Sequence, residues 1–224
     1  MNINIDNNLN FQARNPVIKK ADDIARYVNK LYPRISGTKI YSLDSYAYHK
    51  DSLYYKCKGY VFNKYHNKID NVRYVLRKLY KCKKSNFYKC TSYAEVIKKE
   101  KAGNCGESSF LARMVAACNG IKNTKIVYLA CEGEDLDHYM VYVNDKKPYI
   151  IDSWLGFADY VPNALAKFRS EYSKFIGIDG LSTDSSLYFL ESQGNIITND
   201  KMRYSKNLVN KLVEQYPELV LKQK

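Results

Sequence analysis

The stretch "KKEKAGNCGESSFLARMVAACNGI", residues 98–121, decides the fold, because an apolar helical pattern begins in it directly at a cysteine. Between Gly106 and Asn119 the apolar side chains recur at helical spacing, at Phe110, Leu111, Met114, Val115 and Cys118. Gly120 follows and ends the predicted helix. Cys105 therefore stands at the amino-terminal end of this helix, and its role there is the main question.

Three roles are open to Cys105: a small core residue, a metal ligand or a nucleophile. A lone cysteine is most often a small buried hydrophobe. Zinc ligands usually come in close pairs such as C-x2-C. No such pair occurs among the six cysteines, which are Cys57, Cys82, Cys90, Cys105, Cys118 and Cys131. We therefore expect free thiols, no metal site and no cofactor.

The neighbours of Cys105 favour the nucleophile. Gly103, Asn104 and Gly106 permit a tight turn immediately before the helix. This turn places the sulfur at the helix N-terminus, where unpaired backbone N–H groups favour the thiolate. The same N–H groups, with Asn104 and Gly106 as the candidate donors, could receive an oxyanion when a carbonyl is attacked.

A nucleophilic cysteine needs a base, and the chain has three histidines. His49 and His66 lie in polar segments rich in Tyr and Lys, and we expect both at the surface. His138 opens "HYMVYVN", residues 138–144, a predicted strand rich in Val and Tyr. His138 is therefore the candidate base.

Asp152 is the candidate for the carboxylate that orients the imidazole. It ends the strand predicted in "PYIIDSW", residues 148–154. The turn between this strand and that of His138 is short, so the two strands are predicted to form an antiparallel hairpin. The start of one strand then faces the end of the next, within hydrogen-bond reach.

These motifs resemble a known catalytic core. "GNCGESS", "DHYMVYV" and "IIDSW", within residues 95–157, closely resemble the transglutaminase-like core of the papain-like Cys-His-Asp group. They also resemble papain-like effector proteases and glutamine deamidases that bacteria deliver into host cells. The resemblance implies that Cys105 is the nucleophile, His138 the base and Asp152 the orienting carboxylate. Trp154 is expected either to line the acyl site or to belong to the core.

The implied activity is acyl transfer on a protein substrate. The resemblance leaves deamidation, transamidation and proteolysis open, because the same three residues serve all of them. A catalytically inactive member of the fold that acts as a binding module is the alternative, and an acetyltransferase with the same triad is a third possibility.

The order of elements predicts an α+β fold with the cysteine helix packed on an antiparallel sheet, as in the papain-like and transglutaminase-like core. Further helices are predicted over residues 17–31, 67–84, 91–103, 165–175 and 205–217, with Thr91 or Ser92 and Ser205 as caps. Further strands are predicted over 124–131 and within 186–198, and residues 154–165 are predicted as a loop. We expect an N-terminal helical, basic region over residues 1–90 and the catalytic core over 91–224, in one compact domain.

The net charge of +13 is concentrated in one region. Residues 56–101 hold 14 Lys or Arg against 3 Asp or Glu, a net charge of +11. We expect this block to attract an acidic protein partner or an anionic membrane surface. No nucleic-acid-binding motif is visible, so nucleic acid is not the expected partner.

Targeting signals are not apparent in the sequence. No apolar run reaches the ~18 residues that a membrane-spanning helix needs, and the first residues lack the pattern of a signal peptide. We therefore expect a soluble protein, and the resemblance implies delivery into a host cell by a specialised secretion system.

Overall fold

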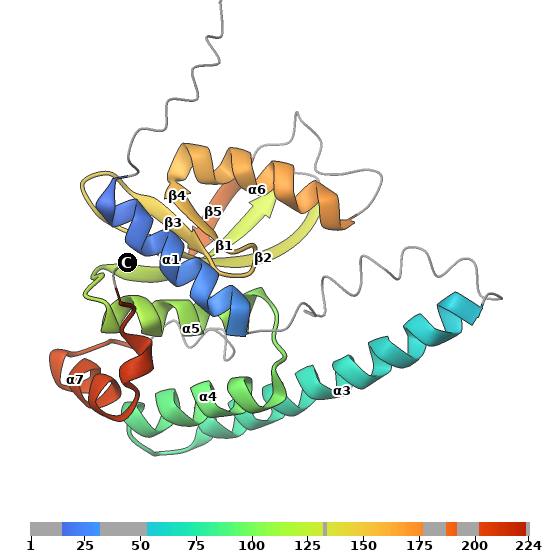
Figure 1. The fold of residues 1–224 in the computed structure, drawn as a ribbon, viewed down its shortest axis with the longest axis horizontal. Coiled ribbons are helices and arrows are strands. Elements are labelled where there is room, and N and C mark those ends of the chain that lie inside the picture. Colours follow the sequence, from blue (N-terminus) through green and yellow to red (C-terminus); the bar gives the residue numbers. More distant parts are fainter. Residues whose placement is uncertain (1–14, 32–52, 132–133, 177–186, 192–201, 223–224) are drawn as a thin grey trace, which may run out of the picture.

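The computed structural model describes residues 15–31, 53–131, 134–176, 187–191 and 202–222. Within these ranges the chain forms helices around an antiparallel sheet, which confirms the predicted α+β class (Figure 1). His49 and the second strand expected within residues 192–198 lie outside the described residues, as does the side chain of His66. No helix in the described ranges has the length and hydropathy of a membrane span.

The sheet has five strands in the order β4-β3-β2-β1-β5, and every neighbouring pair is antiparallel. Their bounds are β1 Thr124–Cys131, β2 Glu134–Val143, β3 Tyr149–Asp152, β4 Phe157–Tyr160 and β5 Leu187–Glu191. The predicted hairpin between β2 and β3 is confirmed: Val141 faces Ile151, and Val143 faces Tyr149. This register sets the distance between His138 and Asp152.

The prediction of a loop over residues 154–165 is wrong in two places. Phe157–Tyr160 forms β4, which pairs with β3, and the helix that follows begins at Val161 instead of Leu165. A strand of four residues is too short to show a clear alternation of apolar and polar side chains, so pairing with β3 decides its conformation.

Helices cover both faces of the sheet (Figure 1). α6 lies on one face, whereas α1 and α5 lie on the other; α4, α7 and α3 follow beyond α5. The helices are α1 Pro16–Leu31, α3 Leu53–Lys81, α4 Asn86–Glu100, α5 Cys105–Cys118, α6 Val161–Ile176 and α7 Lys206–Gln215, and a short 3-10 helix, η1, spans Pro217–Leu219. α5 is therefore enclosed between the sheet and the outer helices.

Two further predicted helices, which correspond to α3 and α4, also differ from the observed ones at their ends. α3 has 29 residues and begins at Leu53, well before the predicted start at residue 67. The earlier part was not predicted because residues 53–66 carry many Tyr and Lys and no clear apolar stripe. α4 is capped by the hydroxyl of Ser85, which accepts from the Tyr88 N–H. Thr91, one of the two predicted caps, lies inside α4 and donates to the Tyr88 carbonyl.

The C-terminal end of α4 differs from the prediction, whereas the N-terminal cap of α7 agrees with it. α4 ends at Glu100, and its C-cap Lys101 takes the left-handed conformation with φ 50°, so the helix stops before residue 103, where the predicted helix ended. The cap of α7 is confirmed, because the Ser205 hydroxyl accepts from the Leu208 N–H.

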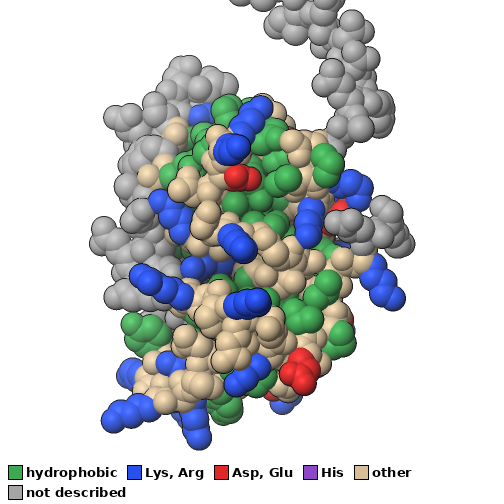
Figure 2. All heavy atoms as spheres, turned by 90° about the vertical axis from the view of Figure 1, so that its left-hand side faces the viewer, with side chains coloured by type: hydrophobic (Ala, Val, Ile, Leu, Met, Phe, Trp, Pro, Cys, Tyr) green, Lys and Arg blue, Asp and Glu red, His purple; other side chains and the backbone are tan. Residues whose placement is uncertain are grey.

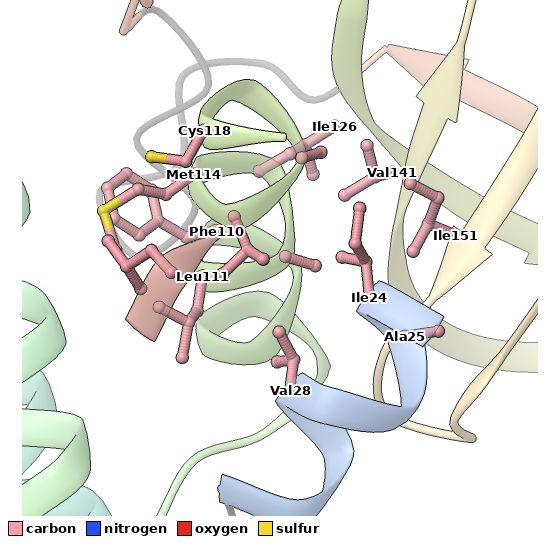
Figure 3. Packing of buried hydrophobic residues seen from close by; sticks show 14 of the residues in the cluster. Ile24, Ala25, Val28, Phe110, Leu111, Met114, Cys118, Ile126, Val141 and Ile151 are labelled. Atoms are coloured by element: carbon pink, nitrogen blue, oxygen red, sulfur yellow. The ribbon is translucent and has the colours of Figure 1, made fainter. Parts of the chain in front are cut away.

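Two hydrophobic clusters form the core, one on each face of the sheet. The larger cluster joins α1 and α5 to one face (Figure 3), through Ile24, Ala25, Val28, Phe110, Leu111, Met114, Cys118, Ile126, Val141 and Ile151 among others. The smaller cluster lies under α6 and includes Cys105, Val127, Leu129, Met140, Ile150, Trp154 and Phe168. The larger cluster contains residues of the predicted N-terminal region, 1–90, and of the predicted catalytic core, 91–224. The boundary between these two regions stays a prediction.

Successive side chains along each strand point to opposite faces of the sheet, so each face has its own set of residues. Val141 and Ile151 point to the α1 and α5 face, whereas Met140 and Ile150 point to the α6 face. His138 is two residues before Met140, and Asp152 is two residues after Ile150, so both belong to the α6 face.

Packing of α1 on the sheet makes a measurable contribution to stability. Ile24 is fully buried in α1, and Ile24→Ala is expected to lower the free energy of unfolding by about 2 to 5 kcal/mol. Val17 lies in the same helix and is 44% exposed, so Val17→Ala serves as the control and should change it by less than about 0.5 kcal/mol. Urea unfolding measures both, and equal effects would contradict this packing.

Candidate active site

Cys105 is the first residue of α5, as predicted. Asn104 precedes it as the N-cap in an extended conformation, and the Asn104 N–H donates to Glu107 Oε2 at 2.8 Å. Cys105 is 6% exposed and belongs to the cluster on the α6 face. Its sulfur is therefore held near the first turn of the helix, where N–H groups without intrahelical acceptors favour an anion.

His138 and Asp152 are brought together by the β2–β3 hairpin. Nε2 of His138 lies 2.8 Å from Oδ2 of Asp152, and both side chains are buried. A hydrogen bond also joins the side chains of His138 and Cys105. Because Nε2 is engaged by Asp152, Nδ1 is the ring nitrogen available to the thiol. The three predicted residues thus form one chain of contacts, Cys105 to His138 to Asp152.

The turn after β3 fixes the carboxylate of Asp152. Its Oδ1 accepts the Trp154 N–H at 3.0 Å and the Leu155 N–H at 2.9 Å, which leaves Oδ2 for His138. Gly156 closes the turn with φ 82°, a left-handed conformation that favours glycine. The carboxylate is therefore oriented before any substrate binds.

Asn29 of α1 holds this turn from the outside. Its side-chain amide donates to the carbonyl oxygens of Ser153 at 3.2 Å and Trp154 at 2.7 Å. A Cβ atom on Gly156 would lie 3.1 Å from Cγ of Asn29, so glycine also permits this close approach. No signal in the sequence links Asn29 to a turn more than a hundred residues away.

Serine side chains tie the cysteine helix to both strands. The Ser153 hydroxyl donates to Ser108 Oγ at 3.1 Å, and the Ser108 hydroxyl donates to the Cys105 carbonyl at 3.2 Å. Ser109 donates to the Tyr139 carbonyl at 2.8 Å, next to His138. The Ser153 hydroxyl thereby links the turn after β3 to α5.

The charge balance around His138 favours the imidazolium. Complete burial lowers its pKa, but the charge and hydrogen bond of Asp152, together with those of Cys105, outweigh it and raise the pKa from 6.5 to about 10. Because the folded-state pKa is the higher one, protonation stabilises the fold. This contribution is complete below pH 6.5 and is lost as the pH rises through about 10.

Aromatic rings enclose the imidazole. The ring centroid of Trp154 lies 5.3 Å from that of His138 in an edge-on arrangement, and Phe168 of α6 lies at 4.8 Å. Trp154 shares the smaller cluster with Cys105, so it is a core residue and also a wall of the candidate site. The imidazole is therefore buried among aromatic side chains, where electrostatic interactions are stronger than in water.

The predicted oxyanion donors lie where expected, at the start of α5. The Asn104 N–H is engaged by Glu107, so only the side chain of Asn104 and the N–H of Gly106 stay as candidates, and their role stays a prediction. Glu107 was not predicted as part of the site, although an acid three residues after Asn104 is a capping-box pattern. Within the described ranges no group of three His, Cys, Asp or Glu side chains could hold a metal ion.

No protein-family model matches the chain, and no significant match to it is found among the curated proteins or the solved structures. Function is therefore inferred from the geometry of the site.

The protonation state of His138 can be measured directly by NMR of its ring nuclei. We expect the imidazole to titrate near pH 10 in the native protein. In Asp152→Asn the largest opposing charge is removed while burial persists, so the pKa should fall toward or below the ordinary 6.5. A native titration near 6.5 that Asp152→Asn leaves unchanged would contradict the ion pair.

Proposed function

We propose that the protein is a thiol-dependent acyl hydrolase or acyltransferase of the papain-like or transglutaminase-like type that acts on a carboxamide of a protein substrate. One observation carries the proposal: Cys105 at the start of α5 is hydrogen-bonded to His138, which pairs with the buried Asp152 at 2.8 Å. Nucleophile, base and orienting carboxylate are the three parts of a covalent acyl-transfer site. Delivery into a host cell rests on the resemblance of the motifs alone.

The chemistry proceeds in two balanced steps. The Cys105 sulfur forms a bond to the amide carbon, the C–N bond then breaks, and His138 gives its proton to the departing nitrogen. The product of this step is a thioester on Cys105, with ammonia released from a glutamine side chain. Water or a primary amine then forms a bond to the thioester carbon and gives a proton to His138. The C–S bond breaks, which restores the thiolate and releases a carboxylic acid or a substituted amide.

The closed geometry favours a slender side-chain amide over a polypeptide backbone. Cys105 and His138 are nearly buried, and the rings of Trp154 and Phe168 stand against the imidazole. A glutamine side chain ends in a carboxamide on two methylene groups and can enter such a site end-on. We therefore propose deamidation or transamidation of glutamine first, with proteolysis as the second candidate.

Acyl transfer can be tested with p-nitrophenyl acetate, whose acyl group is small enough for a narrow site. We expect a burst of nitrophenol equal to the enzyme concentration and an acetyl group on Cys105, identified by mass spectrometry. Cys105→Ala and His138→Ala should lower the rate at least about a thousandfold, whereas the control Cys82→Ala should keep it. A folded protein that shows no burst would instead support the inactive binding module.

The type of reaction follows from the products formed on a glutamine-bearing protein such as casein, in the presence of a fluorescent primary amine. Conversion of glutamine to glutamate indicates deamidation, attachment of the amine indicates transamidation, and shorter fragments indicate proteolysis. We expect one of the first two, lost in Cys105→Ala. Fragments alone would establish the protease and contradict the preference for a side-chain amide.

A basic surface on α3 and the turn into α4 suggests how an acidic protein substrate is attracted. Exposed cations follow the end of α3 and the turn into α4, at Arg77, Lys78, Lys81, Lys83 and Lys84. The exposed rings of Tyr74 and Tyr88 lie under Lys78 and Lys84. Figure 2 shows blue side chains over the whole of this face, including its lower end, where α3 meets α4 in Figure 1. We call these five cations the basic surface and include an acidic protein partner in the proposal.

Binding to the basic surface should depend on salt. We expect poly-glutamate, as a model acidic chain, to bind at about 50 mM NaCl and to be released at about 500 mM, because exposed charges are screened. The triple variant Lys81→Gln, Lys83→Gln and Lys84→Gln should weaken binding at least about tenfold. A triple variant at the exposed Lys146, Lys206 and Lys211 removes the same charge elsewhere and should bind nearly as wild type. Equal losses, or binding only to vesicles of anionic lipid, would contradict an acidic protein partner.

A further inference from the structure

A second ion pair involves Glu107, which lies two residues after Cys105 in α5. Glu107 of α5 is fully buried, and its Oε1 accepts from Nε of Arg73 at 3.2 Å. Arg73 comes from α3, and its side chain is 31% exposed. Burying a carboxylate destabilises a protein unless the carboxylate is paired with a cation. The ion pair with Arg73 therefore stabilises Glu107 in its buried position.

Glu107 connects Arg73 to the residue before the cysteine. Its second oxygen, Oε2, accepts the Asn104 N–H at 2.8 Å. One carboxylate thus joins a side chain of α3 to the backbone from which the Cys105 side chain departs. Any shift of Arg73 changes the hydrogen bond that orients the first turn of α5.

Arg73 also acts on the sulfur through its charge. Burial lowers the pKa of the Arg73 guanidinium, but the charge and hydrogen bond of Glu107, and then the charge of Cys105, raise it above its ordinary value. Cys105 therefore interacts with two groups that carry or take up positive charge: Arg73 from α3, paired with Glu107, and His138 from β2, paired with Asp152.

We propose that Arg73 is a positioning residue of the thiol site, which holds the Asn104–Cys105 peptide through Glu107 and places a second positive charge near the sulfur. This inference rests on the proposed function of Cys105. Arg73 lies one helical turn, about 6 Å along the axis, before Arg77 of the basic surface. The helix that carries the basic surface therefore also supports the nucleophile.

The pH profile of Cys105 alkylation by iodoacetamide, read by mass spectrometry on the full chain, tests the role of Arg73. In Arg73→Gln we expect the midpoint of the profile to rise by about one pH unit, so that alkylation below the midpoint slows about tenfold. Arg73→Lys keeps the charge and should restore part of the shift. Glu107→Gln removes the charge that balances Arg73, so its midpoint should fall, opposite to that of Arg73→Gln.

Arg26 of α1 supplies a matched control. It pairs with the nearly buried Asp22 at 2.8 Å, so Arg26→Gln removes an arginine from a comparable pair and should leave the Cys105 midpoint unchanged. If Arg73→Gln fails to fold, Glu107→Gln tests the same link by the fall in its midpoint, because a glutamine carbonyl oxygen can still accept the Asn104 N–H while the negative charge is removed. Thermal unfolding identifies which variants are folded.

The outcomes separate the two proposals. If native Cys105 shows no reactivity below pH 8, the proposed thiol site itself fails. If native Cys105 is reactive and the folded Arg73 variants keep its midpoint, the site stands and the positioning role of Arg73 is overturned. Equal displacement by Arg26→Gln would also overturn it, because the shift would then follow from a general loss of stability.

Discussion

A helix with almost every side chain buried can carry polar groups only if each of them finds a partner, and this constraint organises the molecule around α5. Thirteen of its 14 residues are buried. Its polar side chains each reach a different element: Glu107 reaches α3, Ser108 the turn after β3, Ser109 reaches β2, and Arg113 contacts Thr124 at the start of β1. Asn119, just after the helix, bonds to the backbone of Leu219 and Leu221.

These tethers explain why a cysteine at the start of α5 is held so firmly. The apolar side chains of α5 provide the energy of packing, since they fill the larger cluster against α1 and the sheet. The polar side chains fix the rotation and the height of the helix relative to β2 and β3. The Cys105 sulfur is consequently placed against His138 by contacts within the protein itself, which is the pre-organisation that the proposed acyl transfer requires.

Two ion pairs then supply the electrostatics, and both use a buried carboxylate. Asp152 has its other oxygen occupied by the N–H groups of a turn, while Glu107 has its other oxygen occupied by Asn104. Each carboxylate is thereby kept in one orientation and pairs with one basic side chain, His138 for Asp152 and Arg73 for Glu107. The arrangement spans α3, α5, β2 and β3, so changes at the end of α3 are expected to reach the thiol through Arg73.

The parts of this site that follow from local pattern could be predicted from the sequence. Glycine and asparagine around Cys105 indicate a helix start, and a short turn between two strands brings His138 near Asp152 by register alone. Asn29 and Arg73 could not be found in this way, because their partners lie far along the chain and only packing brings them together. The four residues of β4 escaped prediction for a similar reason: their strand conformation depends on pairing with β3.

The central claim is that His138 activates Cys105, and the most direct measurement compares thiols within one protein. Iodoacetamide labelling near pH 6.5, mapped by mass spectrometry, gives the rate at Cys105 relative to Cys82, which is less buried. Activation predicts that Cys105 reacts faster despite its burial, and that His138→Ala removes the difference while the rate at Cys82 stays unchanged. If Cys105 reacts no faster than Cys82, or keeps its rate without His138, the account of the site is wrong.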